Sequence, residues 1–353
     1  MTRLAITGGM GFIGSNFVRL LLRTRRDDDV LCVDNLSLGS NPRNLVEIAD
    51  DRRYTFLEGD ISDSRFADRV IKNADVVVNF AAQSHVDRSI QDPTPFISSN
   101  VLGVFALLQA IRKARHEVRF VQIGSDEEYG EIMKDGFEES DPLTPSSPYA
   151  ASKASASMLV LAYRRTYGVK ANITRCTNNF GPYQFPEKFI PRMIINAIQG
   201  RPLPIYGNGR QVRNWLYVED HCMAIDLVLR KGRSGEVYNI AGDYETANIE
   251  LAEDILDLMG KPKRLVKHVP DRPGHDKRYG LDSTKIRKEL GWRPRWNFPA
   301  ALRKTIEWYE SSAGWWKPLL GRIGRRRARW NTAGRSDLRA QKRLKAGFKA
   351  DFT

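Results

Sequence analysis

The sequence has few of the features that mark secreted, metal-binding or membrane-spanning proteins. It contains three cysteines, Cys32, Cys176 and Cys222, whose number and wide spacing fit neither a disulfide framework nor a metal site. No apolar run looks long enough to cross a bilayer, and a strand-like segment at residues 4–6 leaves no room for a secretory leader. We therefore expect reduced thiols, a cytoplasmic location, no membrane insertion and no metal.

An acidic excess is also missing, because the formal net charge at pH 7 is +14. Residues 317–353 contain 12 Lys and Arg against 2 Asp and Glu, a net charge of +10, so the first 316 residues carry only +4. Such a basic tail could contact nucleic acid, an anionic membrane surface or an acidic partner, but most such tails are only solvated. We expect a poorly ordered tail over residues 321–353 whose partner is unknown, and we do not expect nucleic-acid binding.

A glycine pattern near the N-terminus predicts a dinucleotide site. Gly8, Gly11 and Gly14 stand between a strand-like segment and a segment with helical spacing. Glycines at this spacing allow a tight turn and the close approach of a pyrophosphate to a helix N-terminus. Asp34 follows 20 residues after Gly14 at the end of the next strand-like segment, where a carboxylate binds ribose hydroxyls and repels a 2′-phosphate. The cofactor predicted is therefore NAD rather than NADP.

Further apolar segments at residues 56–61, 75–80 and 118–123 predict more strands, and residues 96–114 are predicted to form one long helix. Strands that alternate with helices in this way indicate an α/β fold, here a Rossmann-type doubly wound parallel sheet. The small residues Ala81 and Ala82 after the fourth strand would let a cofactor pass closely. His85 is predicted to be a hydrogen-bonded structural residue rather than a ligand.

The stretch after residue 123 carries the chemistry. Ser125, Asp126 and Glu127 place a hydroxyl and two carboxyl groups beyond the carboxyl end of a strand, where ligands bind in open α/β sheets. Successive strand residues point to opposite faces, so both acids serve one pocket only if the backbone leaves strand geometry here. An acid and a base at this point suit proton removal coupled to expulsion of a poor leaving group. The alternative is a solvated acidic turn.

Tyr149 and Lys153 are four residues apart at the start of a predicted helix, so their side chains share one face. A nearby ammonium favours the phenolate, and we expect Lys153 to lower the pKa of Tyr149. Tyr149 is then a candidate base for a sugar hydroxyl. Lys153 could also hold a nicotinamide ribose.

Taken together, these motifs resemble the extended short-chain dehydrogenase/reductase superfamily and, within it, the dTDP-glucose 4,6-dehydratase family, over about residues 2–320. The strings at residues 81–90, 178–188 and 272–276 match that family closely. Three positions depart from its pattern. Gln83 replaces Glu, Ser125 replaces Thr, and Glu128 replaces a residue that is usually apolar.

The resemblance implies a mechanism and a set of site residues. Tyr149 would take the proton of the glucose 4-hydroxyl, Glu127 would remove the C5 proton, and protonated Asp126 would help the C6 hydroxyl to leave, with Ser125 near the C4 oxygen. The implied NAD-binding residues are Gly8, Gly11, Phe12, Ile13, Gly14, Asp34, Asn35, Ser37, Asp60, Ile61, Ala81, Ala82, Ser99, Tyr149, Lys153 and Asn179. The implied substrate-binding residues are Ser84, Asn178, Lys188, Phe189, Pro204, Tyr206, Arg213, Asn248, Arg272 and His275.

The resemblance also implies two lobes and a homodimer. Residues 1–177 would form the NAD-binding domain, to which a segment near 212–232 returns, and residues 178–320 would mainly form a nucleotide-sugar-binding lobe. The dimer would rest on the helices predicted at 96–114 and 152–167. Dehydration of dTDP-glucose is the activity we expect. The alternatives are use of another nucleotide such as UDP, a nucleotide-sugar 4-epimerase, and a non-catalytic nucleotide-sugar-binding protein.

Overall fold

The computed structural model describes residues 2–323, and it is built around one sheet of seven parallel strands. The strand order is β10-β6-β5-β4-β1-β2-β3, so the direction of winding reverses between β1 and β4. This order is that of a Rossmann sheet, extended by β10, and it confirms the predicted fold class. The strands are β1 (Arg3–Thr7), β2 (Asp29–Asp34), β3 (Tyr54–Glu58), β4 (Val76–Asn79), β5 (Arg119–Ile123), β6 (Ala171–Cys176) and β10 (Val237–Ile240).

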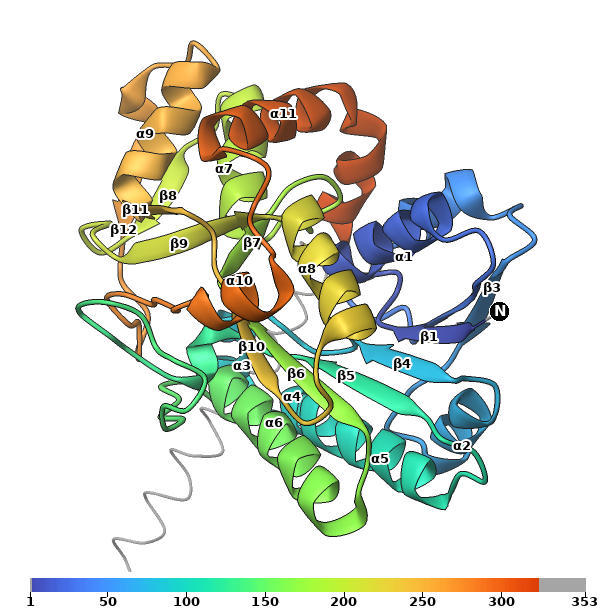
Figure 1. Cartoon of the computed structure of the whole chain (residues 1–353). Coiled ribbons are helices and arrows are strands. Elements are labelled where there is room, and N and C mark those ends of the chain that lie inside the picture. Colours follow the sequence, from blue (N-terminus) through green and yellow to red (C-terminus); the bar gives the residue numbers. More distant parts are fainter. Residues whose placement is uncertain (1, 324–353) are drawn as a thin grey trace, which may run out of the picture.

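Helices cover both faces of this sheet, which is why its central strands are apolar on both sides (Figure 1). One face is covered by α2 (Ser64–Lys72), α5 (Gly103–Lys113) and α6 (Pro148–Tyr167), and the other by α1 (Phe12–Thr24) and α8 (Val218–Lys231). Helix α10 (Thr284–Leu290) contacts β10 and α8. Short elements complete this part of the chain: η1 (Pro42–Ile48), α3 (Val86–Gln91), α4 (Thr94–Phe96), η2 (Ile97–Leu102) and η3 (Asp126–Glu128).

The helix predicted over residues 96–114 is instead a composite. A π-helical turn, η2, joins α4 to α5. The whole helix Thr94–Lys113 has 20 residues and a mean hydropathy of 1.5, so by length and composition it could cross a membrane, contrary to the expectation from the sequence. Half of it is buried in the protein, where α5 packs against α2 and α6. The apolar residues of this helix thus pack in the protein core beside the large sheet.

The second lobe packs beside the carboxyl ends of the large sheet (Figure 1). It has two small sheets, made of β7 (Asn178–Phe180), β9 (Val212–Tyr217) and β11 (Tyr244–Ala247), and of β8 (Leu203–Tyr206) and β12 (Val266–Val269). Its helical elements are α7 (Phe189–Ile198), α9 (Asn248–Leu258), η4 (Lys263–Leu265) and α11 (Phe298–Ser311). Since β9 runs directly into α8, the two lobes share chain segments. They join near the carboxyl ends of the large sheet, where open α/β sheets generally bind ligands.

A C-terminal helical segment, residues 313–323, follows α11 and reaches back to the first lobe. Ile323 is 9% exposed and packs with Phe185 and Leu319. Arg322 donates hydrogen bonds to the carbonyl oxygens of Ser40 (2.9 Å) and Ser37 (3.4 Å). Residues 321–323 were expected to belong to a poorly ordered tail, but these contacts make them part of the folded protein. The remainder of the predicted tail, 324–353, lies outside the described residues.

Candidate active site

The backbone leaves strand geometry directly after β5, as the paired acids require. Ser125 is extended and caps η3, and its Oγ accepts a hydrogen bond from the Glu127 backbone N–H (3.3 Å). The Asp126 carboxyl also accepts this N–H (2.9 Å) and lies 3.1 Å from the Ser125 Oγ. The tight turn brings Ser125, Asp126 and Glu127 to the wall of one cavity. The reading of this stretch as a solvated acidic turn is therefore wrong.

The two acids meet different surroundings. Asp126 is 4% exposed, and its Oδ2 atom has no hydrogen-bond partner among the described residues. Burial, and then the charge of Glu127, raises the pKa of Asp126 to about 7. Burial also raises the pKa of Glu127, but the positive charges of Arg272, Arg213 and Lys188 oppose that rise. Asp126 is thus suited to hold a proton and Glu127 to accept one.

Tyr149 and Lys153 lie in the first turns of α6, whose N-terminus is capped by Ser147. The Tyr149 backbone N–H donates to Ser89 Oγ (3.1 Å), and Lys153 Nζ donates to the carbonyl oxygen of Ile123 (2.5 Å). Both side chains line the same cavity as the acids. The expected lowering of the Tyr149 pKa is wrong for this state of the site. Burial and the Glu127 carboxylate raise that pKa well above its ordinary value, although the Ser125 hydroxyl acts in the opposite direction.

One cavity runs from the glycine turn (residues 8–14) to the catalytic turn (residues 125–127). All sixteen residues predicted to bind NAD line it, including Asp34 at one end and Lys153 at the other. Ser84, Asn178 and Lys188, from the predicted substrate set, line it as well. The residues predicted for the cofactor are thus brought together along one cavity, and their binding roles stay predictions.

The glycine turn fits a dinucleotide because it has no room for side chains. Gly8 has a φ of +70°, and a Cβ atom there would lie 2.6 Å from the backbone nitrogen of Ala81. A Cβ atom at Gly14 would lie 2.3 Å from the Gly8 carbonyl oxygen. Backbone N–H groups at the start of α1 consequently stay open to the cavity. Asp34, 4% exposed, accepts hydrogen bonds from the backbone N–H groups of Met10 (3.0 Å) and Leu36 (2.8 Å) and is thereby fixed at the cavity wall.

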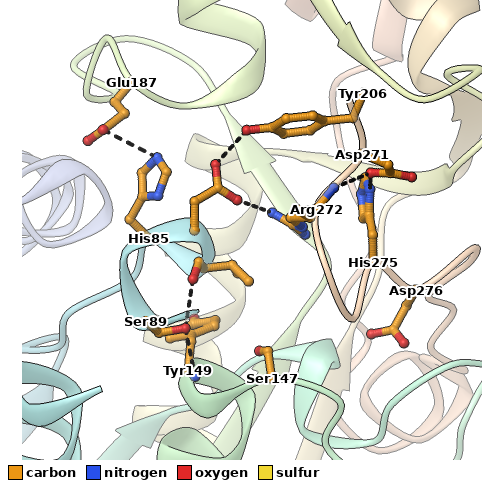
Figure 2. A network of polar contacts seen from close by, with 12 residues as sticks. His85, Ser89, Ser147, Tyr149, Glu187, Tyr206, Asp271, Arg272, His275 and Asp276 are labelled. Carbon is orange, nitrogen blue, oxygen red and sulfur yellow. Dashed lines mark hydrogen bonds and ion pairs between the residues drawn. The ribbon is translucent and has the colours of Figure 1, made fainter. Parts of the chain in front are cut away.

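Beyond the catalytic turn, several predicted substrate residues belong to one polar network (Figure 2). Tyr206 Oη donates to the carboxylate of Asp87 (2.8 Å), and Arg272 donates to its other oxygen (3.0 Å). His275 contacts Asp271 at 2.7 Å. Figure 2 shows Tyr206, Arg272 and His275 on the side of the second lobe and Tyr149 on the side of α6. The network therefore bridges the two lobes.

Arg213 lies in β9 with its guanidinium 4.2 Å from the centre of the Tyr279 ring, and its charge acts on both catalytic acids. Phe189, Pro204 and Asn248 sit at the start of α7, in β8 and at the start of α9, outside the lining of the large cavity. Phe189 packs into the core of the second lobe near Trp215. The substrate roles of all ten predicted residues stay predictions.

His85 lies 3.6 Å from Glu187, and its Nδ1 is buried without a hydrogen-bond partner among the described residues, so the structure does not show the hydrogen-bonded histidine that was predicted. Burial lowers the pKa of His85 to about 4. The three cysteines are unpaired and buried. Gln83, one of the departures from the family pattern, donates its backbone N–H to Asn100 (2.8 Å) and its side-chain amide to Ser37 Oγ (3.3 Å). It thus supports the cavity wall with an amide in place of a carboxylate.

Three polar residues around the acids were not predicted from the sequence: Asp87, Asp276 and Tyr279. Tyr279 Oη lies 3.5 Å from Glu127 Oε2 and donates to Asp276 (2.7 Å). Asp87 and Asp276 belong to the segments 81–90 and 272–276 that resemble the family, and these segments are the signal that could have indicated them. Tyr279 lies just outside, three residues after Asp276.

Residues 5–305 match the family model described as GDP-mannose 4,6 dehydratase. The chain belongs to that family. A dTDP-glucose 4,6-dehydratase of Streptomyces niveus is 49% identical over 322 residues, covering 90% of this chain and 95% of the relative. The solved structure of a dTDP-glucose 4,6-dehydratase from Streptomyces venezuelae with NAD bound is 47% identical, with a TM-score of 0.88 and coverage of 90% and 99%.

Epimerases of the same fold are more distant from this 4,6-dehydratase family member. The UDP-glucose 4-epimerase of Thermotoga maritima is 30% identical, with a TM-score of 0.81 and coverage of 88% of this chain and 99% of the epimerase. The resemblance to the 4,6-dehydratases is therefore confirmed over most of the chain.

Proposed function

We propose that the protein is an NAD-dependent 4,6-dehydratase that converts dTDP-glucose into its 4-keto-6-deoxy derivative. The observation that carries this proposal is the placement of Asp126 and Glu127 in one cavity with Tyr149 and Lys153. A reaction confined to C4 needs a base such as Tyr149 but no acid and base for C5 and C6. The names of the relatives and of the solved structures support the same choice.

The residues present fit NAD as the cofactor. The glycine turn leaves space and N–H donors for a pyrophosphate, and Asp34 is placed for a ribose without a 2′-phosphate. Lys153, at the far end of the same cavity, is placed for the second ribose. When bound, NAD supplies the oxidant for C4 and the reductant for C6, so the net reaction is loss of water.

The side chains of the catalytic turn divide the proton transfers among themselves. Tyr149 removes the proton of the 4-hydroxyl, with the Ser125 hydroxyl stabilising its phenolate. The resulting C4 carbonyl makes the C5 proton acidic, and Glu127 removes it. Asp126, whose pKa is raised to about 7 and which is therefore partly protonated near neutral pH, gives its proton to the departing C6 hydroxyl. These roles need one of the two neighbouring acids to hold a proton while the other accepts one.

The nucleotide end of the substrate is assigned to the second lobe. Lys188, Arg213 and Arg272 supply positive charge close to Glu127 and are suited to bind the diphosphate. Tyr206 and His275, whose rings lie 5.9 Å apart, would lie further along towards the base. UDP-glucose differs from dTDP-glucose by one base methyl group, worth roughly 1–3 kcal/mol, and by one ribose 2′-hydroxyl, so it is a close competing substrate.

Purified protein incubated with dTDP-glucose tests the proposal directly. The expected product is the 4-keto-6-deoxy sugar nucleotide, with a higher kcat/KM than UDP-glucose gives. Formation of dTDP-galactose would instead identify a 4-epimerase, and better use of UDP-glucose would change the nucleotide but not the mechanism. Absence of turnover on dTDP-, UDP-, CDP- and GDP-glucose, with NAD still bound, would point to a non-catalytic binding protein.

We also propose a homodimer in the cytoplasm. The exposed sides of η2, α5 and α6 carry large apolar residues: Ile97, Leu102, Phe105 and Met158 are 42–61% exposed. Because η2 and α5 both contact α6, these residues form one apolar face that a second copy of the chain could cover by two-fold symmetry. The buried, unpaired cysteines are compatible with a reducing compartment.

A further inference from the structure

Behind the catalytic turn lies a buried carboxylate that the proposed mechanism does not use. Glu128 is 0% exposed. Its Oε1 accepts the backbone N–H of Ser125 (3.0 Å), and its Oε2 accepts Ser157 Oγ (2.7 Å) and Arg175 Nε (2.8 Å). Burying a carboxylate is costly unless its oxygens are satisfied, and here three donors satisfy them. The side chain thus joins the turn, helix α6 and strand β6.

The partner of this carboxylate is anchored just as firmly. Arg175, in β6, is 2% exposed, donates to Tyr129 Oη (2.7 Å) and lies 4.7 Å from the centre of the Tyr129 ring. Tyr129 Oη in turn donates to Asn239 in β10 (3.1 Å). Both ends of the catalytic turn are thereby tied to neighbouring strands of the large sheet. Gly124 shows how close the packing is, because a Cβ atom there would lie 2.6 Å from Glu128 Oε1.

Two residues of the turn are in direct contact. Ser125 lacks the methyl group that restricts χ1 of a threonine. Glu128 holds the backbone nitrogen of this same serine. The two residues are three positions apart in the chain and joined by one hydrogen bond, so Glu128 can offset the freedom that serine has at position 125.

We propose that Glu128 is a positioning residue for the catalytic turn, and that it provides the restraint that serine lacks at position 125. It does not line the cavity, so it acts through Ser125, Asp126 and Glu127 rather than on the substrate. This inference rests on the proposed function for its kinetic consequences. Its charge has a second effect: burial lowers the pKa of Lys153, and the Glu128 carboxylate opposes that shift by favouring the ammonium form.

The experiment compares the holoenzymes of wild type, Glu128→Val and the double variant Ser125→Thr/Glu128→Val. We expect Glu128→Val to lower kcat about tenfold or more while KM changes by about twofold or less, since the substrate is not touched. Elimination depends on the two acids of the turn and should slow more than oxidation, so bound NADH should accumulate on adding dTDP-glucose. The double variant should recover kcat to within about threefold of wild type.

Two results overturn the inference. One is a Glu128→Val enzyme with wild-type kcat and wild-type NADH level, and the other is a loss that Ser125→Thr does not repair. Asp226→Asn is the matched control, because Asp226 is also a buried acid between two arginines, Arg25 and Arg230, but lies in α8 away from the cavity. It should lower thermal stability without NADH accumulation.

A second variant is available if Glu128→Val does not fold. Glu128→Val/Arg175→Met replaces the whole ion pair with apolar side chains. The same criteria then apply to this variant and to the triple variant that also carries Ser125→Thr.

Hydrogen exchange separates a failure of this inference from a failure of the proposed function. Wild-type protein that makes no product contradicts the function alone. The peptide covering residues 124–130 then decides the inference without substrate. Exchange about tenfold faster in Glu128→Val and slow again in the double variant supports it. Equal exchange in all three proteins overturns it.

Discussion

Asp126 and Glu127 are chemically similar neighbours whose surroundings give them opposite tasks. The Asp126 carboxyl is buried, and one of its oxygens has no partner among residues 2–323, whereas Glu127 faces three cations and the Tyr279 hydroxyl. A carboxyl group that keeps its proton and one that loses it are what an elimination across C5 and C6 requires.

Replacement of Glu127 by glutamine should remove the base for C5 and leave oxidation at C4 possible, because Tyr149 and Lys153 are untouched. We expect the dehydration rate to fall about 10²-fold or more. Bound NADH should then appear on mixing with dTDP-glucose, as a rise in near-ultraviolet absorbance. Tyr149→Phe is the matched control and should give little NADH. Normal turnover by Glu127→Gln would mean that another group is the base.

Asp126 should also make the stability of the protein depend on pH. Its pKa rises from an ordinary 3.8 to about 7 in the folded state, so the proton is held more tightly in the folded chain than in the unfolded one. The stabilisation from that proton is complete below about pH 4 and is lost as pH rises through about 7. Asp126→Asn carries no such proton. The melting temperature of Asp126→Asn minus that of wild type should therefore be larger at pH 8 than at pH 5. The measurement uses cofactor-free protein. An equal difference at both pH values would contradict the assignment.

At the scale of elements, the C-terminal helical segment supports the loop after β2. Arg322 binds the carbonyl oxygens of Ser37 and Ser40, Trp315 Nε1 donates to Asn44 (2.8 Å), and Arg43 donates to the Gly314 carbonyl (3.1 Å). Several residues of that loop line the predicted adenosine end of the cavity. The segment is thus placed to support residues 35–44, which we call the cofactor loop, from outside the cavity.

Truncation after Leu320 should consequently weaken NAD binding, since it removes Arg322 and Ile323. We expect a dissociation constant about tenfold higher, equivalent to about 1.4 kcal/mol, with a smaller effect on kcat at saturating NAD. Truncation after Ile323 is the control and should bind NAD as the full chain does. Calorimetric titration of cofactor-free proteins compares the three chains. Equal affinities for all of them would show that the segment does not support the site.

At the scale of the whole molecule, the proposed dimer depends on the apolar face of η2, α5 and α6. Met158 is 61% exposed and Phe105 42% exposed, so charges there would be solvated in a monomer but buried in the dimer. We expect Phe105→Glu/Met158→Lys to elute as a monomer in gel filtration with light scattering, with far-UV circular dichroism unchanged. Glu58→Lys, on the edge strand β3 away from this face, should leave the elution volume unchanged. A wild-type protein that is itself monomeric would contradict the proposal.

The sequence predicted the sheet and the cavity well because both depend on local signals. Apolar runs mark the strands, glycine spacing marks the turn before α1, and polar residues at strand ends mark the cavity. It predicted less well where packing between distant segments decides. The raised pKa of Tyr149, the burial of Thr94–Lys113 and the contacts of Arg322 all depend on neighbours far away in the chain. Asp87 and Tyr279 were missed for the same reason, since their roles come from partners on the other lobe.

The reach of the C-terminal helical segment has a consequence for synthesis on the ribosome. The cofactor loop emerges about 280 residues before the residues that cover it. At about 5–20 residues per second, the loop waits on the order of tens of seconds for Arg322. The nascent sheet can therefore form well before its nucleotide site is finished. If Arg322 supports NAD binding as predicted, ribosomes that stop before it release chains that have the sheet but a loosened loop after β2.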